Sequence, residues 1–298
     1  MQAAKRGYEA WLRRSLMLSS FVILPMLSGF FSAACGEVPN SPHALEAGRV
    51  QEDYNALLDS LATQPLENRL AALQFFLHRH PNCAAAYARL LECYFGQNQL
   101  SHAEAFFDSI SKTPQHAVLG SWMLAKVFVK QERIESARAA FTRALVVAPP
   151  SLLLLKDFTE FCQRNRARLD PQALIAATIP RREDRQSAKA LLSYHHQDYA
   201  HALEFFQKQW VQSPENLALL QLLADCLLQM RRNLEAAAIL RKGLAQAGRE
   251  KDFAAQAWFL TSLGLLKQRE GIFDRAQYQN AESFYQSAYA LAARYDDA

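Results

Sequence analysis

The sequence predicts an all-α fold of stacked antiparallel helix pairs, and two observations carry this prediction. Half of the 298 residues are apolar and only 10 are glycine, which favours a continuous helical core over a turn-rich β fold. The second observation is an internal repeat, in which an alanine is followed by an apolar residue four positions later and by a break near position twelve. The repeated alanines are Ala103, Ala137, Ala202 and Ala236.

The spacing of these alanines defines the length of the repeat. They are 34, 65 and 34 residues apart, so that the middle interval is slightly shorter than two repeats and contains one irregular copy. The apolar residues at the fourth position are Phe107, Phe141, Phe206 and Leu240, and the breaks are Pro114, Pro149, Pro214 and Gly248.

A second helical segment precedes each alanine. In these segments apolar residues recur at steps of three and four, which is the period of an α-helix. The segments are YARLLECYF from Tyr87, WMLAKVFV from Trp122, AKALLSYHH from Ala188 and LLQLLADCLLQ from Leu219. Each repeat is therefore expected to be two antiparallel helices joined by a tight polar turn.

This pattern resembles the tetratricopeptide repeat (TPR) family. The first small position of that family falls on Leu91, Ala125, Ala190 and Ala224, and its tyrosine position falls on Tyr94, Phe128, Ser193 and Leu227. The resemblance implies a right-handed superhelical solenoid of antiparallel helix pairs. In this family the first helices line a concave face that receives extended or helical segments of partner proteins.

Three regions are expected along the chain. Residues 1–34 are a signal peptide, 35–50 a tether, and 51–298 a TPR-like solenoid of about six to seven helix pairs. Within the solenoid, residues 152–182 form the irregular repeat and residues 251–298 an extended last unit. Terminal units of such arrays are commonly atypical because they cap the core.

The signal peptide prediction rests on the three parts of residues 1–34. A basic head is followed by the apolar segment LMLSSFVILPMLSGFF, and small residues lead to Cys35. Pro25, Ser28 and Gly29 interrupt the apolar segment, which favours cleavage over a permanent membrane span of about 20 apolar residues. We expect the protein to be exported, to the periplasm of a bacterium.

Small residues directly before Cys35 resemble the lipobox of bacterial lipoproteins, in which the cysteine is lipidated and becomes the mature N-terminus. Ser32 and Ala34 equally suit ordinary signal-peptidase cleavage after Ala34, which would leave a soluble protein. Of these two alternatives we prefer lipidation of Cys35, which would attach the protein to a membrane.

Charge and motifs exclude several other functions. Residues 35–298 hold 29 of the 33 basic and 28 of the 29 acidic residues, and so lack the basic excess typical of nucleic-acid binding. We find no glycine-rich phosphate loop, no Gly-x-Ser-x-Gly motif and no His-Glu-x-x-His motif. The sequence therefore predicts no catalytic residues, no metal site and no cofactor.

The resemblance places a partner-binding groove on the first helices. In this family certain positions of the first helices face into the groove. The corresponding residues of this sequence are charged and aromatic, as is typical of peptide grooves. These residues are Arg89, Glu92, Phe95, Trp122, Lys126, Lys130, Tyr194, Gln221 and Asp225. The alternative for Trp122 is burial between repeats, and for the two lysines it is a solvated surface.

We therefore expect a non-enzymatic scaffold of the cell envelope that binds a protein or peptide partner. One alternative is an assembly factor for an envelope machine that acts through homodimerisation of the solenoid. Another is an enzyme with an unrecognised site. The sequence does not distinguish pilus assembly, secretion, polysaccharide export and wall remodelling.

Overall fold

The computed structural model describes residues 42–61, 64–270 and 275–296, and all of their regular structure is helical. The signal peptide, Cys35 and the first part of the tether lie outside the described residues. The helices are α2 (Pro42–Leu61), α3 (Leu66–Arg79), α4 (Ala84–Gly96), α5 (Leu100–Ser111), the short 3-10 helix η3 (Pro114–His116), α6 (Ala117–Lys130), α7 (Ile134–Val147), α8 (Leu152–Arg164), α9 (Pro171–Thr178), α10 (Arg182–His195), α11 (Tyr199–Gln212), α12 (Leu217–Gln229), α13 (Asn233–Arg249), α14 (Phe253–Glu270) and α15 (Arg275–Asp296).

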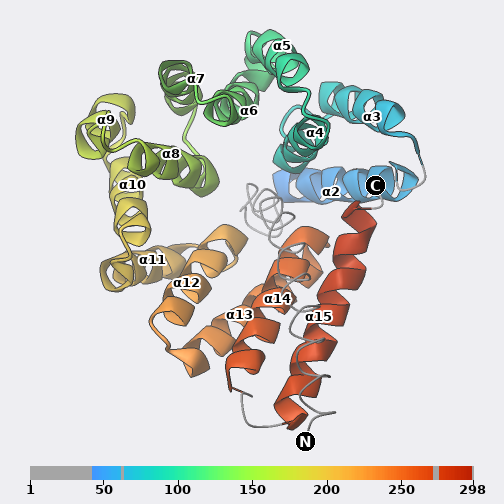
Figure 1. Cartoon of the computed structure of the whole chain (residues 1–298), viewed down its shortest axis with the longest axis vertical. Helices are drawn as coiled ribbons and strands as arrows, with labels where there is room; N and C mark the ends of the chain where they lie inside the picture. Colours follow the sequence, from blue (N-terminus) through green and yellow to red (C-terminus); the bar gives the residue numbers. More distant parts are fainter. Residues whose placement is uncertain (1–41, 62–63, 271–274, 297–298) are drawn as a thin grey trace, which may run out of the picture.

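Most helices that follow one another in the sequence pack side by side, from α3 against α4 to α14 against α15. The exception is α7 and α8, which make few contacts, and α8 packs chiefly on α10. This arrangement confirms the predicted all-α solenoid of helix pairs. Figure 1 shows that the array curves back on itself, so that α2 lies next to the end of α15. In the first half of the array α4, α6 and α8 lie on the inner side of the curve, and α3, α5, α7 and α9 lie outside.

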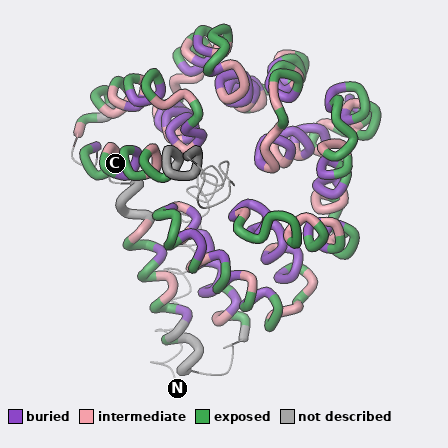
Figure 2. Tube along the Cα trace, turned by 180° about the vertical axis from the view of Figure 1, so that it is seen from behind, coloured by how far each residue is buried: buried purple, intermediate pink, exposed green. Residues whose placement is uncertain are grey.

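The repeated alanines lie where the helices approach most closely. Ala103, Ala137, Ala202 and Ala236 are all fully buried. The apolar residues four positions later, one helical turn further along, are also buried, as expected for positions on one face of a helix. Figure 2 shows buried positions recurring along the helices between exposed ones.

The same turn closes four of the helix pairs. After α4, α6, α10 and α12 a non-glycine residue adopts positive φ, with values from 55° to 66°. After α4, the amide of Asn98 donates to the Phe95 carbonyl and that of Gln99 donates to the Tyr94 carbonyl, at 3.0 and 2.9 Å. These are the two hydrogen bonds of a Schellman motif, which ends a helix by capping its last carbonyls.

The pair formed by α8 and α9 lies between the pair α6–α7 and the pair α10–α11. Ser151 caps α8 by accepting a hydrogen bond from the Leu154 amide at 3.2 Å. The partner helix α9 has only 8 residues and begins at Pro171 after the cap residue Asp170. At the C-terminus α14 and α15 are much longer, with 18 and 22 residues.

At the N-terminus α2 begins at Pro42, within the segment expected to be a tether. A proline is compatible with the first turn of a helix because the N–H that it lacks has no partner there. The tether prediction therefore extends too far, because residues 42–50 continue the helix that carries the buried Tyr54 and Leu58. No helix among the described residues has the length and apolar character needed to cross a membrane.

Candidate functional site

Polar side chains from the first helices of successive pairs form one network, which we call the first-helix network. Its members lie on α6, α8, α10 and α12, and each is close in space to another member. They are Trp122, Lys126, Lys156, Asp157, Tyr194, His195 and Asp225.

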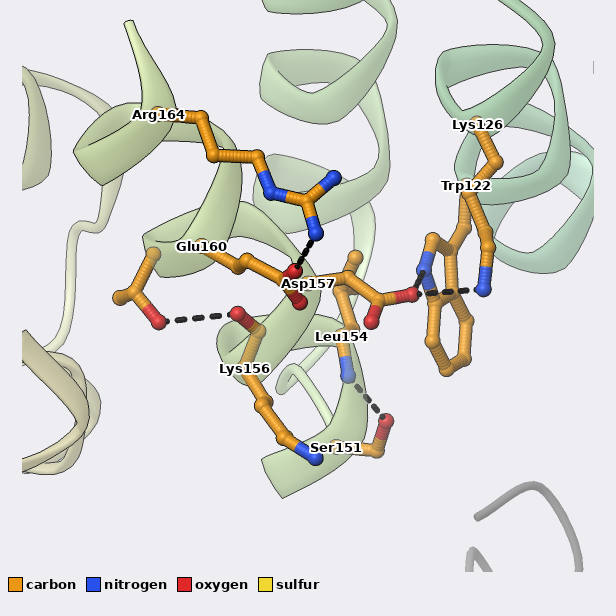
Figure 3. A network of polar contacts seen from close by, with 9 residues as sticks. Trp122, Lys126, Ser151, Leu154, Lys156, Asp157, Glu160 and Arg164 are labelled. Carbon is orange, nitrogen blue, oxygen red and sulfur yellow. Dashed lines mark hydrogen bonds and ion pairs between the residues drawn. The ribbon is translucent and has the colours of Figure 1, made fainter. Parts of the chain in front are cut away.

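Asp157 joins α8 to α6. Its Oδ2 accepts a hydrogen bond from the Trp122 indole at 2.9 Å and forms an ion pair with Lys126 Nζ at 3.0 Å. Figure 3 shows both α6 side chains reaching toward the carboxylate of Asp157. Because the Lys126 and Asp157 side chains are only 22% and 25% exposed, water screens their attraction less than that of a surface pair. This junction holds α6 and α8 in a defined relative position.

Lys156, the residue before Asp157, places its amine in a poorly solvated environment. Burial lowers the pKa of this amine, while the carboxylates of Asp157, Glu160 and Asp225 act in the opposite direction. Basic and acidic side chains therefore alternate along the first-helix network, from Lys126 through Asp157 and Lys156 to Asp225.

Tyr194 and Asp225 join α10 to α12. The Tyr194 hydroxyl donates a hydrogen bond to Asp225 Oδ2, and Gln229 donates to Oδ1 of the same carboxylate at 3.3 Å. Burial, followed by the neighbouring Asp225 charge, raises the pKa of the Tyr194 phenol. The Tyr194 ring also packs edge-on against Tyr199 at a centroid distance of 5.8 Å.

His195 is the neutral member of the first-helix network. Burial and the nearby Lys156 charge lower its pKa to about 4, so that the imidazole is uncharged at neutral pH. Its Nε2 atom is buried and has no hydrogen-bond partner among the described residues.

Other predicted groove residues lie outside this network. Arg89 and Glu92 form an ion pair on α4, with Nη1 and Oε2 3.4 Å apart. Burial lowers the pKa of the Arg89 guanidinium, but the Glu92 charge and other contacts outweigh this effect and the pKa is raised. Phe95 is half-buried against the core, and Lys130 is exposed at the end of α6.

Two residues expected to line the groove are instead buried. Trp122 and Gln221 are each 1% exposed. For Trp122 the structure supports the burial alternative, because its indole N–H is turned toward Asp157 and its ring lies in the core. Gln221 lies on α12, of which nearly every residue is buried by neighbouring helices.

The structure thus brings Trp122 and Lys126 together at Asp157 and joins Tyr194 to Asp225. It adds Lys156 and Asp157 of α8, which were not predicted because α8 lies in the irregular repeat, where the family positions could not be transferred. Their signal in the sequence is the interruption of the apolar segment LLLL by Lys-Asp. Among the described residues no cluster of three or more His, Cys, Asp or Glu side chains is arranged to hold a metal ion.

Comparison with known proteins finds tetratricopeptide repeats. A tetratricopeptide repeat family model matches residues 194–258, from the end of α10 into α14. A tetratricopeptide repeat protein from Parabacteroides merdae, known from a crystal structure, is similar at 13% identity and a TM-score of 0.36, with coverage of 81% of this chain and 99% of that chain. No curated protein matches the sequence. The fold is an all-α, TPR-like solenoid, and residues 194–258 match the repeat itself.

Proposed function

We propose that this chain is a non-enzymatic scaffold that binds a partner protein through the surface of its first helices. The observation that carries the proposal is the family match over residues 194–258, which includes Tyr194 and Asp225 of the first-helix network. Tetratricopeptide repeats are in general modules for protein–protein interaction, and proteins of this fold are typically scaffolds.

The character of the surface supports this proposal. Lys126, Asp157, Tyr194 and Asp225 are partly exposed on successive first helices, so that an extended segment would meet charged groups of both signs and one aromatic ring. Lys130 is exposed one turn beyond Lys126 on α6, which places a free cation at the edge of this surface.

Export and lipidation form the second part of the proposal. The basic head, apolar segment and small residues before Cys35 support a lipoprotein of the bacterial envelope, held at a membrane by its N-terminus. In producing cells grown with labelled palmitate, the native chain should take up label and the Cys35→Ala variant should not. Equal labelling of the two would contradict the anchor.

Site-specific photocrosslinking in the producing cells tests partner binding. A photoreactive amino acid replaces Lys130 on α6 or, as a matched control, the exposed Arg143 on the second helix α7. We expect a discrete crosslinked species from position 130 and little from position 143. Equal products from both positions, or none from either, would contradict binding by the first helices.

A further inference from the structure

The two ends of the array meet, and polar side chains contact one another there. Lys251, in the turn between α13 and α14, forms an ion pair with Glu52 of α2, with Nζ and Oε1 2.7 Å apart. The buried amide of Asn55 donates to the Lys251 carbonyl at 3.0 Å. These pairs join residues 199 and 196 positions apart in the sequence. We call this contact the seam.

Hydrogen bonds within the turn at the seam fix the backbone conformation of Lys251. Lys251 adopts φ 54°, and the next amide, that of Asp252, donates to the Ala247 carbonyl at 2.9 Å. The buried Asp252 carboxylate then caps α14 by accepting from the Ala255 amide at 2.9 Å. The carbonyl of Lys251 is therefore held toward α2 by the hydrogen bonds of this turn.

The Asn55 amide is similarly fixed. Its Oδ1 accepts a hydrogen bond from Gln51 one turn earlier on α2, at 3.2 Å, while its Nδ2 donates across the seam. Both polar atoms of the buried Asn55 amide are therefore hydrogen-bonded, and the partner of Nδ2 is the Lys251 carbonyl. A polar group buried without a hydrogen bond is costly, which favours this pairing when the two ends are in contact.

The two sides of α2 differ in how strongly they are bound. Toward α3 and α4, the buried Tyr54 packs on the Phe76 ring at a centroid distance of 5.9 Å and its hydroxyl donates to the Ala85 carbonyl at 3.3 Å. Toward the C-terminal corner, Glu52 and Lys251 are 58% and 59% exposed. An ion pair this exposed contributes little and is screened by salt. The exposed ion pair at the seam is thus a weaker contact than the packing and hydrogen bond of the buried Tyr54 on α3 and α4.

We propose that the array is a closable ring that opens at the seam, with α2 remaining on the N-terminal repeats and separating from the Lys251 corner. Figure 1 shows the geometry, in which α2 passes the ends of α14 and α15 and completes the ring. If the proposed function is correct, opening the seam is also the route by which a partner segment reaches the first helices from the side.

Fluorescence energy transfer on the full chain in detergent tests the opening. Donor and acceptor are placed at the exposed Ala56 of α2 and the exposed Ala245 of α13, through non-natural amino acids. Glu52→Lys should lower the transfer efficiency, because it places two cations at the seam. The exchanged pair Glu52→Lys with Lys251→Glu should restore it. The matched control Asp59→Lys, an equal charge change on the same helix, should leave it unchanged.

A carbodiimide, which condenses a carboxylate and an amine in contact into an amide, provides the second measurement. It should join Glu52 to Lys251 in the native chain and give the same linkage, with the residues exchanged, in the double variant. Raising salt should lower the transfer efficiency of the native chain but not of chains already joined by the amide. This salt comparison holds even where Glu52→Lys fails to fold.

Two results would overturn the proposal. One is native-like transfer in a folded Glu52→Lys variant, and the other is absence of the Glu52–Lys251 amide in the native chain. Both measurements use the chain alone, so that their failure leaves partner binding untouched. Where a partner has been captured, Glu52→Lys should bind it more tightly, by about tenfold if the closed ring outnumbers the open one ten to one.

Discussion

At the scale of single residues, the non-glycine residues that adopt positive φ after several helices are a local source of strain. Glu132 ends α6 with φ 59°, a conformation that costs a residue with a side chain about 1–2 kcal/mol and costs glycine almost nothing. We expect Glu132→Gly to raise the free energy of unfolding by about 0.5–1 kcal/mol, because part of this gain is offset by the greater freedom of glycine in the unfolded chain.

Chemical unfolding followed by circular dichroism measures this effect. The control is Ala139→Gly on the exposed face of α7, which should destabilise by about 1 kcal/mol, as glycine does inside a helix. A loss of stability in Glu132→Gly comparable to that of the control would mean that the left-handed residue is not strained.

His195 provides a prediction of pH dependence at the same scale. Burial, together with the Lys156 charge, holds its pKa at about 4 against an ordinary value of 6.5. Below pH 6.5 the unfolded chain therefore binds a proton that the folded chain does not, and stability falls until the pH reaches about 4. His195→Gln should reduce the loss of unfolding free energy between pH 7 and pH 4.5, by at most about 3 kcal/mol.

Urea unfolding at the two pH values compares this variant with the native chain and with His102→Gln at an exposed position of α5. The His102 variant should keep the native pH dependence. If His195→Gln keeps it as well, the imidazole is not held neutral by its surroundings.

At the scale of helices, the packing of α13 on α14 depends on one glycine. A methyl group at Gly243 would lie 2.2 Å from Cε1 and Cζ of Phe259, whose ring is fully buried and cannot move aside freely. Gly243→Ala should therefore destabilise the fold by about 1–3 kcal/mol, although alanine is the better helix former.

Gly248 on the same helix is the matched control. A methyl group there would meet no atom within 4 Å, so Gly248→Ala should leave the thermal midpoint unchanged or raise it. A stabilising Gly243→Ala would show that α13 and α14 are further apart than the structure has them.

The helices themselves could be predicted because the sequence encodes them locally. Ala137 and Phe141 repeat the arrangement of Ala103 and Phe107 at the same phase, and buried small and large residues at a helical period specify a helix pair without distant information. The surface of α8 could not be predicted in this way, because no alanine of the repeat marks its orientation. Asp157 was therefore missed as the partner of Lys126.

At the scale of the whole molecule, the sequence indicated a curved array but not that its ends meet. Closure depends on the small rotation between successive pairs, which adds up over the array and has no local signature. Nothing in the sequences around Glu52 and Lys251 relates the two segments, and their contact is visible only in three dimensions. The first helices α4, α6 and α8, to which part of the predicted groove belongs, therefore lie on the inner side of a ring in the structure (Figure 1).

Binding of a partner protein by the first helices, as proposed, predicts how surface charges change the affinity of the partner captured by photocrosslinking. Calorimetry would compare the native chain with Lys130→Glu on α6 and with the equally large charge change Arg143→Glu on α7. We predict that Lys130→Glu weakens binding about tenfold, a loss of about 1.4 kcal/mol, and that Arg143→Glu changes it less than about twofold. Equal affinities of the two variants would contradict the account.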